Sequence, residues 1–164
     1  MLRRLRRCDD ATTYLSQALD REPSDHSVRL QLALCLRQAG RDVEALEVIE
    51  GAAEAYPIEI MYQDGLARLL ASADDEVRDG ARALEMAEAM VQAGKTIETM
   101  DVLAMAYAES GDTELALRAV DDAISLAKAQ RSPAIMMDHQ ESNRARYLAG
   151  KPSRTTWPGF LMEQ

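Results

Sequence analysis

Small and medium apolar side chains recur along the chain at intervals of three and four residues, as in Ala11, Leu15 and Ala18. This spacing places them on one face of an α-helix, whereas a half-buried strand would alternate apolar and polar residues. The pattern predicts little or no strand. It predicts helices near residues 8–20, 25–39, 42–56, 58–72, 79–93, 97–110, 113–129 and 133–149.

Polar residues and prolines mark the ends of these predicted helices. Ser24 and Asp42 are N-cap candidates, and Asp112 begins a helix directly after Gly111. Ser132 supplies a further cap, with Pro133 in the first turn, where the missing N–H costs nothing. In the last helix we expect Ile135, Met136, His139, Tyr147 and Leu148 to line the packed side.

The apolar pattern repeats at a fixed interval. Pro23 and Pro57 each close an alanine-rich helical segment, and they are 34 residues apart. The same interval separates Ala11 from Ala45, Leu15 from Ile49, Ala18 from Ala52, and Leu32-Ala33 from Leu66-Ala67. A period of 34 residues indicates a helical repeat protein, in which no single repeat can bury its apolar face alone.

At this point the chain resembles the tetratricopeptide repeat family, whose repeat is a helix-turn-helix of about 34 residues. The last repeat matches best, through Leu103, Ala104, Tyr107, Gly111, Ala116, Val120 and Ala123. The first full repeat matches through Leu32, Ala33, Leu36, Gly40, Ala45, Ile49 and Pro57. The middle repeat departs, because its second helix arrives four residues late and Ser72 to Gly80 must form a longer turn. The tryptophan position of the family pattern holds Arg29, Gln63 and Met100 instead.

The resemblance implies an all-α fold, a right-handed superhelix of antiparallel helix pairs closed by a C-terminal capping helix. The expected repeat domain spans residues 1–149, with a half repeat at 1–23, repeats at about 26–59, 60–96 and 97–130, and the capping helix at 133–149. Residues 150–164 form a tail, in which Trp157 and Phe160 either fold back or dock on another chain. Small residues allow the paired helices to approach closely: Ala33, Ala45, Ala67, Ala83, Ala104 and Ala116.

In this family the first helix of each pair lines a concave groove that receives a peptide or helix of a partner protein. The corresponding positions here are Ser27, Leu30, Leu34, Arg37, Met61, Asp64, Arg68, Glu98, Asp101, Met105 and Glu109. The set is apolar near Leu30 and acidic near Asp101, so we expect an amphipathic or basic partner segment. Reversal of Asp64 and Asp101 to lysine should then weaken capture.

A second hypothesis concerns the N-terminus. The register, run backward from Leu36, reaches Leu2, so Met1 falls in the middle of a first helix and half a hairpin is missing. Ala11, Leu15 and Ala18 would then lack a complete partner helix. In this alternative the chain is the C-terminal segment of a larger array, or it self-associates or packs in an assembly through its N-terminal half repeat.

Charge and composition narrow the class of partner. The formal net charge of −9 repels phosphate backbones and argues against nucleic-acid binding. The arginines at positions 3, 4, 6 and 7 are interpreted as a solvated helix face. No apolar run is long enough to cross a membrane, and charged residues follow Leu2 where a signal peptide needs an apolar stretch. We therefore expect a cytoplasmic protein that binds another protein and neither membrane nor nucleic acid.

The sequence offers little catalytic chemistry. Gly94-Lys95-Thr96 matches the end of a phosphate-binding loop, but Ala89 stands where the first glycine is required, and Thr96 is better explained as an N-cap. Asp74, Asp75 and Asp79 lack the spacing of a calcium loop. Cys8 and Cys35 lack metal-ligand neighbours and are expected to be buried thiols. The expectation is a protein that is not an enzyme and has no catalytic residue, metal site or cofactor.

Overall fold

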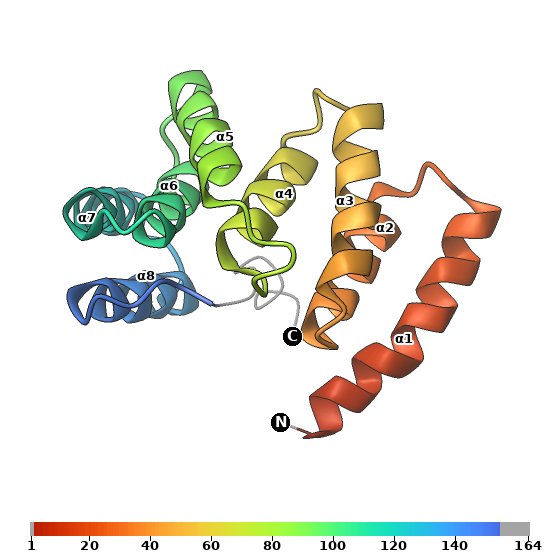
Figure 1. Ribbon diagram of the computed structural model, residues 1–164. Coiled ribbons are helices and arrows are strands. Elements are labelled where there is room, and N and C mark those ends of the chain that lie inside the picture. The colour runs from red at the N-terminus through yellow and green to blue at the C-terminus, as the bar shows by residue number, and fades with distance from the viewer. Residues whose placement is uncertain (1, 155–164) are drawn as a thin grey trace. The chain divides into compact units, whose positions relative to one another are not determined.

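The computed structural model describes residues 2–154, with only the backbone described for residues 2–7 and Asp9. All regular structure in this range is α-helical (Figure 1). The helices are α1 (Leu2–Arg21), α2 (His26–Gln38), α3 (Asp42–Ala55), α4 (Ile60–Ser72), α5 (Gly80–Ala93), α6 (Ile97–Glu109), α7 (Thr113–Ala129) and α8 (Ala134–Leu148). The expected all-α repeat architecture is therefore confirmed, whereas Trp157 and Phe160 lie outside the described residues.

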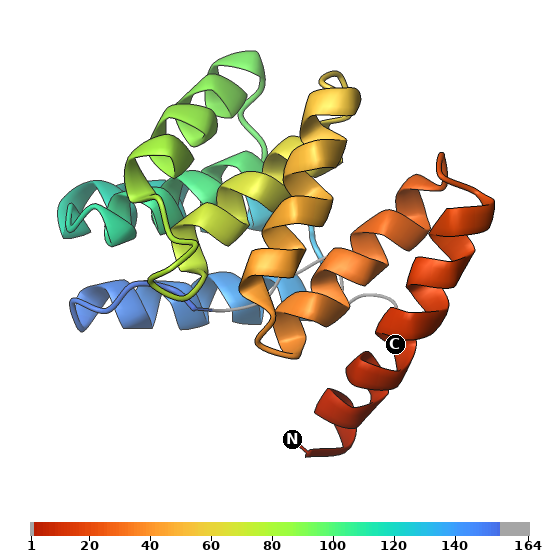
Figure 2. The same cartoon turned by 45° about the vertical axis from the view of Figure 1, so that its right-hand side comes forward.

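The described residues divide into two compact units. Unit 1 comprises the chain up to Leu66 together with Ala73–Val77, and unit 2 comprises Ala67–Ser72 and the chain from Arg78 onward. In unit 1, α2 packs between α1 and α3, and Figure 2 shows α1 lying along α2. In unit 2, α5, α6 and α7 each pack against the next helix in sequence. Helix α4 contributes residues to each unit.

The helix boundaries differ from the prediction mainly at the N-terminus. Residues 2–21 form one continuous helix, so no separate first helix ends before residue 8. Leucine and arginine are strong helix formers, and no glycine or proline interrupts the segment, so the helix extends through it. The long turn expected after Ser72 is confirmed, because α5 begins only at Gly80.

Several of the predicted N-caps shift by one residue. The cap of α2 is Asp25, not Ser24, and its carboxylate accepts a hydrogen bond of 3.0 Å from the N–H of Val28. Asp42 is the first residue of α3, and Pro133 rather than Ser132 precedes α8. Asp42 is buried, and its carboxylate accepts from Arg37 at 2.8 Å, so it serves tertiary structure instead of capping. Asp112 and Thr96 are N-caps as predicted.

The six alanines expected at helix contacts are all buried, and four of them have no exposed surface. They lie in α2, α3, α4, α5, α6 and α7. A methyl side chain lets two helix backbones approach closely, and closely packed interiors leave no space for a larger group. The small residues of the repeat pattern therefore determine how near the helices lie within each unit.

Four helices end in the same left-handed turn. After α2, α6 and α8 the turn residue is glycine, with φ of 75° at Gly40, 82° at Gly111 and 66° at Gly150. After α7 the same position holds Arg131, with φ of 55°. In each turn the next N–H donates to a carbonyl of the last helical turn, as in the 2.9 Å bond from Ser132 to Ala127.

Replacement of Arg131 by glycine should raise the free energy of unfolding by about 0.5–1 kcal/mol. A residue with a Cβ atom pays roughly 1–2 kcal/mol in the left-handed region, and the extra chain entropy of glycine offsets part of that gain. Urea denaturation followed by circular dichroism measures the change. Gly111→Ala, at the equivalent turn after α6, is the matched control and should lower stability; an Arg131→Gly variant that is less stable than the parent would contradict the assignment.

Candidate functional site

The structure separates the predicted groove residues between the two units. In unit 1, Leu30, Leu34 and Arg37 of α2 are half-buried, Met61 of α4 is exposed, and Asp64 is buried. In unit 2, Arg68, Asp101 and Met105 are buried, Glu109 is half-buried, and Glu98 is exposed. The two carboxylates chosen for charge reversal, Asp64 and Asp101, are thus both buried. Reversing them would disturb the fold as well as any bound partner.

Apolar side chains reach the surface of unit 1 where α4 begins. Ile58 is 87 % exposed, and Ile60 and Met61 are also exposed. The N-terminal ends of α2 and α4 meet through His26 and Tyr62, whose Nδ1 and hydroxyl oxygen are 2.7 Å apart. The ring of Tyr56 packs edge-on against His26. The rings of His26, Tyr56 and Tyr62 thus pack together close in sequence to the exposed aliphatic side chains.

In unit 2 the predicted groove residues form a buried polar network. Arg68 Nη1 donates to Asp101 Oδ2 at 2.5 Å, and Arg68 Nη2 donates to the backbone oxygen of Glu98 at 3.2 Å. His139 Nε2 lies 3.2 Å from Asp101 Oδ2, and Asn143 Nδ2 donates to Asp101 Oδ1 at 3.2 Å. Asp101 has no exposed surface, so these partners replace the water that an ionised carboxylate requires.

The network holds Asp101 in its charged form. Burial alone would raise the pKa of the carboxyl group, but the Arg68 guanidinium and His139 hold that pKa well below its usual value. A carboxylate that is buried and paired in this way has a structural role, because Arg68, His139 and Asn143 already occupy its oxygens.

The network extends to a segment that sequence analysis treated as tail. Ser153 is 1 % exposed, and its hydroxyl donates to Asn143 Oδ1 at 2.9 Å. Arg154 donates to Glu109 Oε2 at 2.8 Å and to the backbone oxygen of Ala71 at 3.4 Å. Residues of α4, α6 and α8 are therefore joined to the segment that follows α8. Sequence spacing carries no sign of these contacts, because they join residues up to 83 positions apart.

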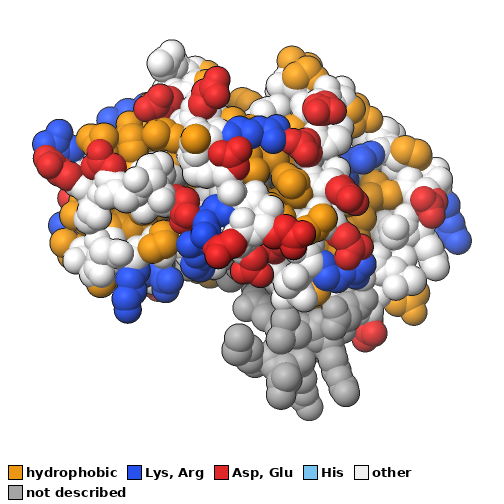
Figure 3. All heavy atoms as spheres, in the orientation of Figure 1, with side chains coloured by type: hydrophobic (Ala, Val, Ile, Leu, Met, Phe, Trp, Pro, Cys, Tyr) orange, Lys and Arg blue, Asp and Glu red, His pale blue; other side chains and the backbone are white. Residues whose placement is uncertain are grey.

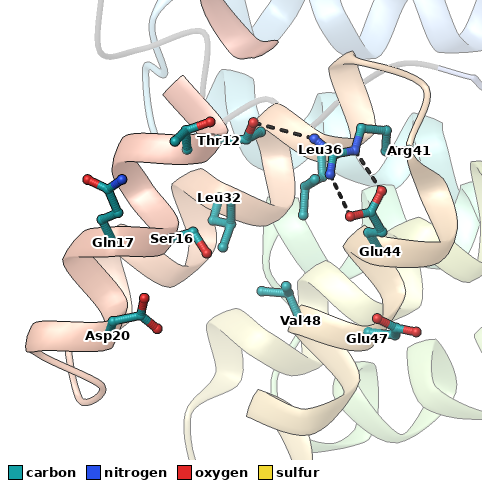
Figure 4. A pocket seen from close by; sticks show the side chains of 11 residues that line it. Thr12, Ser16, Gln17, Asp20, Leu32, Leu36, Arg41, Glu44, Glu47 and Val48 are labelled. Atoms are coloured by element: carbon teal, nitrogen blue, oxygen red, sulfur yellow. Dashed lines mark hydrogen bonds and ion pairs between the residues drawn. The ribbon is translucent and has the colours of Figure 1, made fainter. Parts of the chain in front are cut away.

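A groove in unit 1 was not anticipated from the sequence. It lies between α1 and α3, over α2, and encloses about 450 Å³ (Figure 4). Leu32, Leu36 and Val48 supply its apolar surface, and Thr12 and Ser16 are among the polar residues on the α1 side. Its α1 members recur at helical spacing, so the groove follows the helix axis.

The rim of this groove is acidic. Asp20, Glu44 and Glu47 line it, against a single cation, Arg41. Arg41 donates to both oxygens of Glu44, at 2.6 and 2.5 Å, and to Thr12 at 3.4 Å, as the dashed lines of Figure 4 show. The hydrogen bond from Arg41 lowers the pKa of Glu44, so this carboxylate stays ionised near neutral pH. Two carboxylates remain in excess of the single cation.

A second hollow, in unit 2 between α7 and α8, has balanced charge. It encloses about 350 Å³, and its charged residues are Asp121, Glu141, Lys128 and Arg144. Arg144 donates to Asp121 at 2.6 Å across the hollow. Because cations and carboxylates are equal in number here, this hollow does not share the preference of the unit 1 groove for a positively charged occupant.

Three further properties of the described residues concern metal ligands, membrane spans and thiols. Among residues 2–154 whose side chains are described, no group of His, Cys, Asp and Glu is arranged to hold a metal ion. Within the same range no helix has the length and apolarity to cross a membrane. Cys8 and Cys35 are buried free thiols, and burial raises the pKa of Cys35 to about 12.

The face of the molecule drawn in Figure 3 shows apolar surface between acidic side chains.

Comparison with protein-family models gives a match at the N-terminal end of the chain. The family model described as tetratricopeptide repeat matches residues 2–57, which include α1, α2, α3 and the whole groove of Figure 4. No curated protein and no solved structure matches the chain. Residues 2–57, which hold the first part of the 34-residue register, are therefore similar to the tetratricopeptide repeat family.

Proposed function

We propose that this protein holds a basic, amphipathic segment of a partner protein and that unit 1 provides the surface. Repeats of this family generally mediate protein–protein interaction and are not catalytic. The observation that carries the proposal is the groove between α1 and α3, which combines an apolar floor with an acidic rim. Apolar side chains of the partner would supply affinity, and its cations would set its orientation.

The first helices of unit 1 are the alternative surface for the same function. They present half-buried Leu30 and Leu34 on α2 and exposed Met61 on α4. Arg37 and Asp64 contribute less, because the first pairs with Asp42 and the second is buried. In unit 2, Arg68, Asp101 and Met105 are buried, so a partner on the predicted groove would meet mainly Glu98 and Glu109 there.

Charge reversal on the groove rim should weaken binding of a basic amphipathic peptide by about tenfold or more. Asp20→Lys with Glu47→Lys changes two exposed carboxylates and leaves the Arg41–Glu44 pair in place. The probe is a labelled synthetic helix with leucine on one face and lysine on the other, and fluorescence anisotropy measures its affinity. The same helix with glutamate in place of lysine should not bind.

The matched control carries the same change of charge in unit 2. Glu85→Lys with Asp138→Lys alters two exposed carboxylates on α5 and α8 and should leave the affinity near that of the parent. If the control weakens binding as much as the rim variant, net charge rather than the groove is responsible. If Met61→Ser abolishes binding and the rim variant does not, the peptide binds to the surface of α2 and α4 and not to the groove.

A second candidate function is self-assembly through α1. Ala11, Leu15 and Ala18 are half-buried, and Tyr14 is exposed on the same helix. A copy or an assembly partner packed on α1 would cover this surface. Light scattering of the purified chain tests it: a monomer at all concentrations rules out self-assembly, whereas a dimer that Leu15→Asp dissociates supports it.

A further inference from the structure

The chain that follows α8 turns back onto unit 2. Gly150 has a φ of 66°, and the N–H groups of Gly150 and Lys151 donate to Tyr147 and Arg146, each at 2.9 Å. This cap ends α8 and directs Pro152, Ser153 and Arg154 along the helices of unit 2. These three residues are neither helical nor part of a turn.

Each of these three residues is contacted by a different polar group of unit 2. The backbone oxygen of Pro152 accepts from Arg146 Nε at 3.3 Å. The hydroxyl of Ser153 donates to Asn143 at 2.9 Å, and the guanidinium of Arg154 pairs with Glu109 at 2.8 Å. Unit 2 therefore contacts, in order along the chain, the backbone carbonyl of Pro152, the hydroxyl of Ser153 and the guanidinium of Arg154.

The groups that make these contacts are held in place by other residues. Asn143 is fixed by its hydrogen bond to Asp101 and lies 3.1 Å from His139, independently of the segment. Glu109 is fixed by Arg78, whose Nε lies 2.6 Å from Glu109 Oε1, and its side chain rests against Gly80, where an added Cβ would come within 3.1 Å. The site is therefore built by unit 2 itself and does not depend on the segment for its shape.

Within Lys151–Arg154, Ser153 is buried, Pro152 is half-buried, and Lys151 and Arg154 are exposed. No apolar side chain of Lys151–Arg154 is fully buried. A preformed polar site whose occupant is held through polar groups and buries no apolar side chain completely is the arrangement expected of an exchangeable ligand.

We propose that this face of unit 2 is a second recognition site, specific for an extended peptide in which serine or threonine is followed by arginine, and that Pro152–Arg154 fill it in cis. Asn143 selects the small hydroxyl, because its buried amide would lose a hydrogen bond to any residue without a donor. Glu109 selects the cation, and Arg154 Nη1, which pairs with Glu109, also donates to the Ala71 carbonyl. A partner segment of this kind must displace the protein's own residues.

The test uses the peptide of residues 149–156 and a chain that ends at Gly150. NMR titration follows the side-chain amide of Asn143. The shortened chain should show saturable shifts, and the full chain should bind at least about tenfold more weakly, since the site is already filled. Peptides with Ser153→Ala or Arg154→Ala should bind the shortened chain about tenfold more weakly, whereas Lys151→Ala, the matched control, should bind as well as the parent.

Two results would overturn the proposal. One is a shortened chain with an unchanged helical spectrum that shows no saturable shift. The other is equal affinity for the parent and the Ser153→Ala peptide. If the shortened chain unfolds, the full chain with Ser153→Ala and Arg154→Ala takes its place: tighter binding than the parent chain supports the site, and unchanged binding refutes it. These outcomes concern unit 2 alone, so the groove variants of unit 1 neither support nor undermine them.

Discussion

Asp101→Ala should lower the free energy of unfolding by about 3–5 kcal/mol, the largest effect expected of any single substitution in unit 2. The substitution leaves the Arg68 guanidinium buried without its counterion, and it also removes an acceptor from Asn143 and from His139. Urea denaturation followed by circular dichroism measures the loss. A destabilisation of less than about 1 kcal/mol would show that the network is not what holds these helices together.

Two further measurements separate the network from a general effect of losing a charge. Asp138→Ala, an exposed aspartate on α8, should change stability by no more than about 0.5 kcal/mol. Replacement of both partners, as in Arg68→Met with Asp101→Leu, should cost less than Asp101→Ala, because no buried charge is then left alone.

The same carboxylate gives stability a defined pH dependence. Because the folded state lowers the pKa of Asp101, its contribution is complete above the unfolded value of about 3.9 and is lost as pH falls through the folded value. The parent chain should therefore lose stability under acidic conditions more steeply than Asp101→Ala does. An equal acid dependence of the two chains would assign that loss to other carboxylates.

Ala116→Leu should destabilise the chain by about 1–3 kcal/mol. Ala116 has no exposed surface in α7, so the added carbon atoms must displace a neighbouring helix or adopt strained side-chain angles. Thermal denaturation measures the change, and Ala129→Leu is the matched control, because Ala129 lies at the exposed end of the same helix. Equal stability of the two variants would mean that the alanines of the register are not the points of close approach.

The helices could be predicted well because their signals are local. Apolar spacing, Thr96, Asp112 and the glycine after each of three helices act within one or two turns, so they are visible in the sequence. The one-residue errors at Ser24 and Ser132 have the same origin, since two adjacent residues each carry a capping or helix-starting preference. The middle repeat shows that even a stretched turn can be placed when both flanking helices keep their pattern.

The candidate site could be predicted only in part, because it depends on contacts between distant residues. The register placed Arg68, Asp101 and Met105 on the first helices, but it could not indicate that they are buried or that α8 supplies hydrogen-bond partners for Asp101. Of the side chains expected on the packed side of α8, His139 and Tyr147 are buried, whereas Ile135 and Leu148 are exposed. The other buried residues of this helix are the polar Gln140 and Asn143. A helix whose packed face is polar has no hydrophobic signature, so its partners become visible only in three dimensions.

Helix α4 determines how this protein can be divided for study. Its residues up to Leu66 belong to unit 1, and Ala67–Ser72 belong to unit 2. A fragment that begins at Arg78 would lack Arg68, so it would carry Asp101 as a buried carboxylate without its cation. A fragment of unit 2 should therefore begin before Ile60 and include the whole of α4. For the same reason, a protease that cuts within α4 should destabilise unit 2 although every residue of α5 to α8 remains intact.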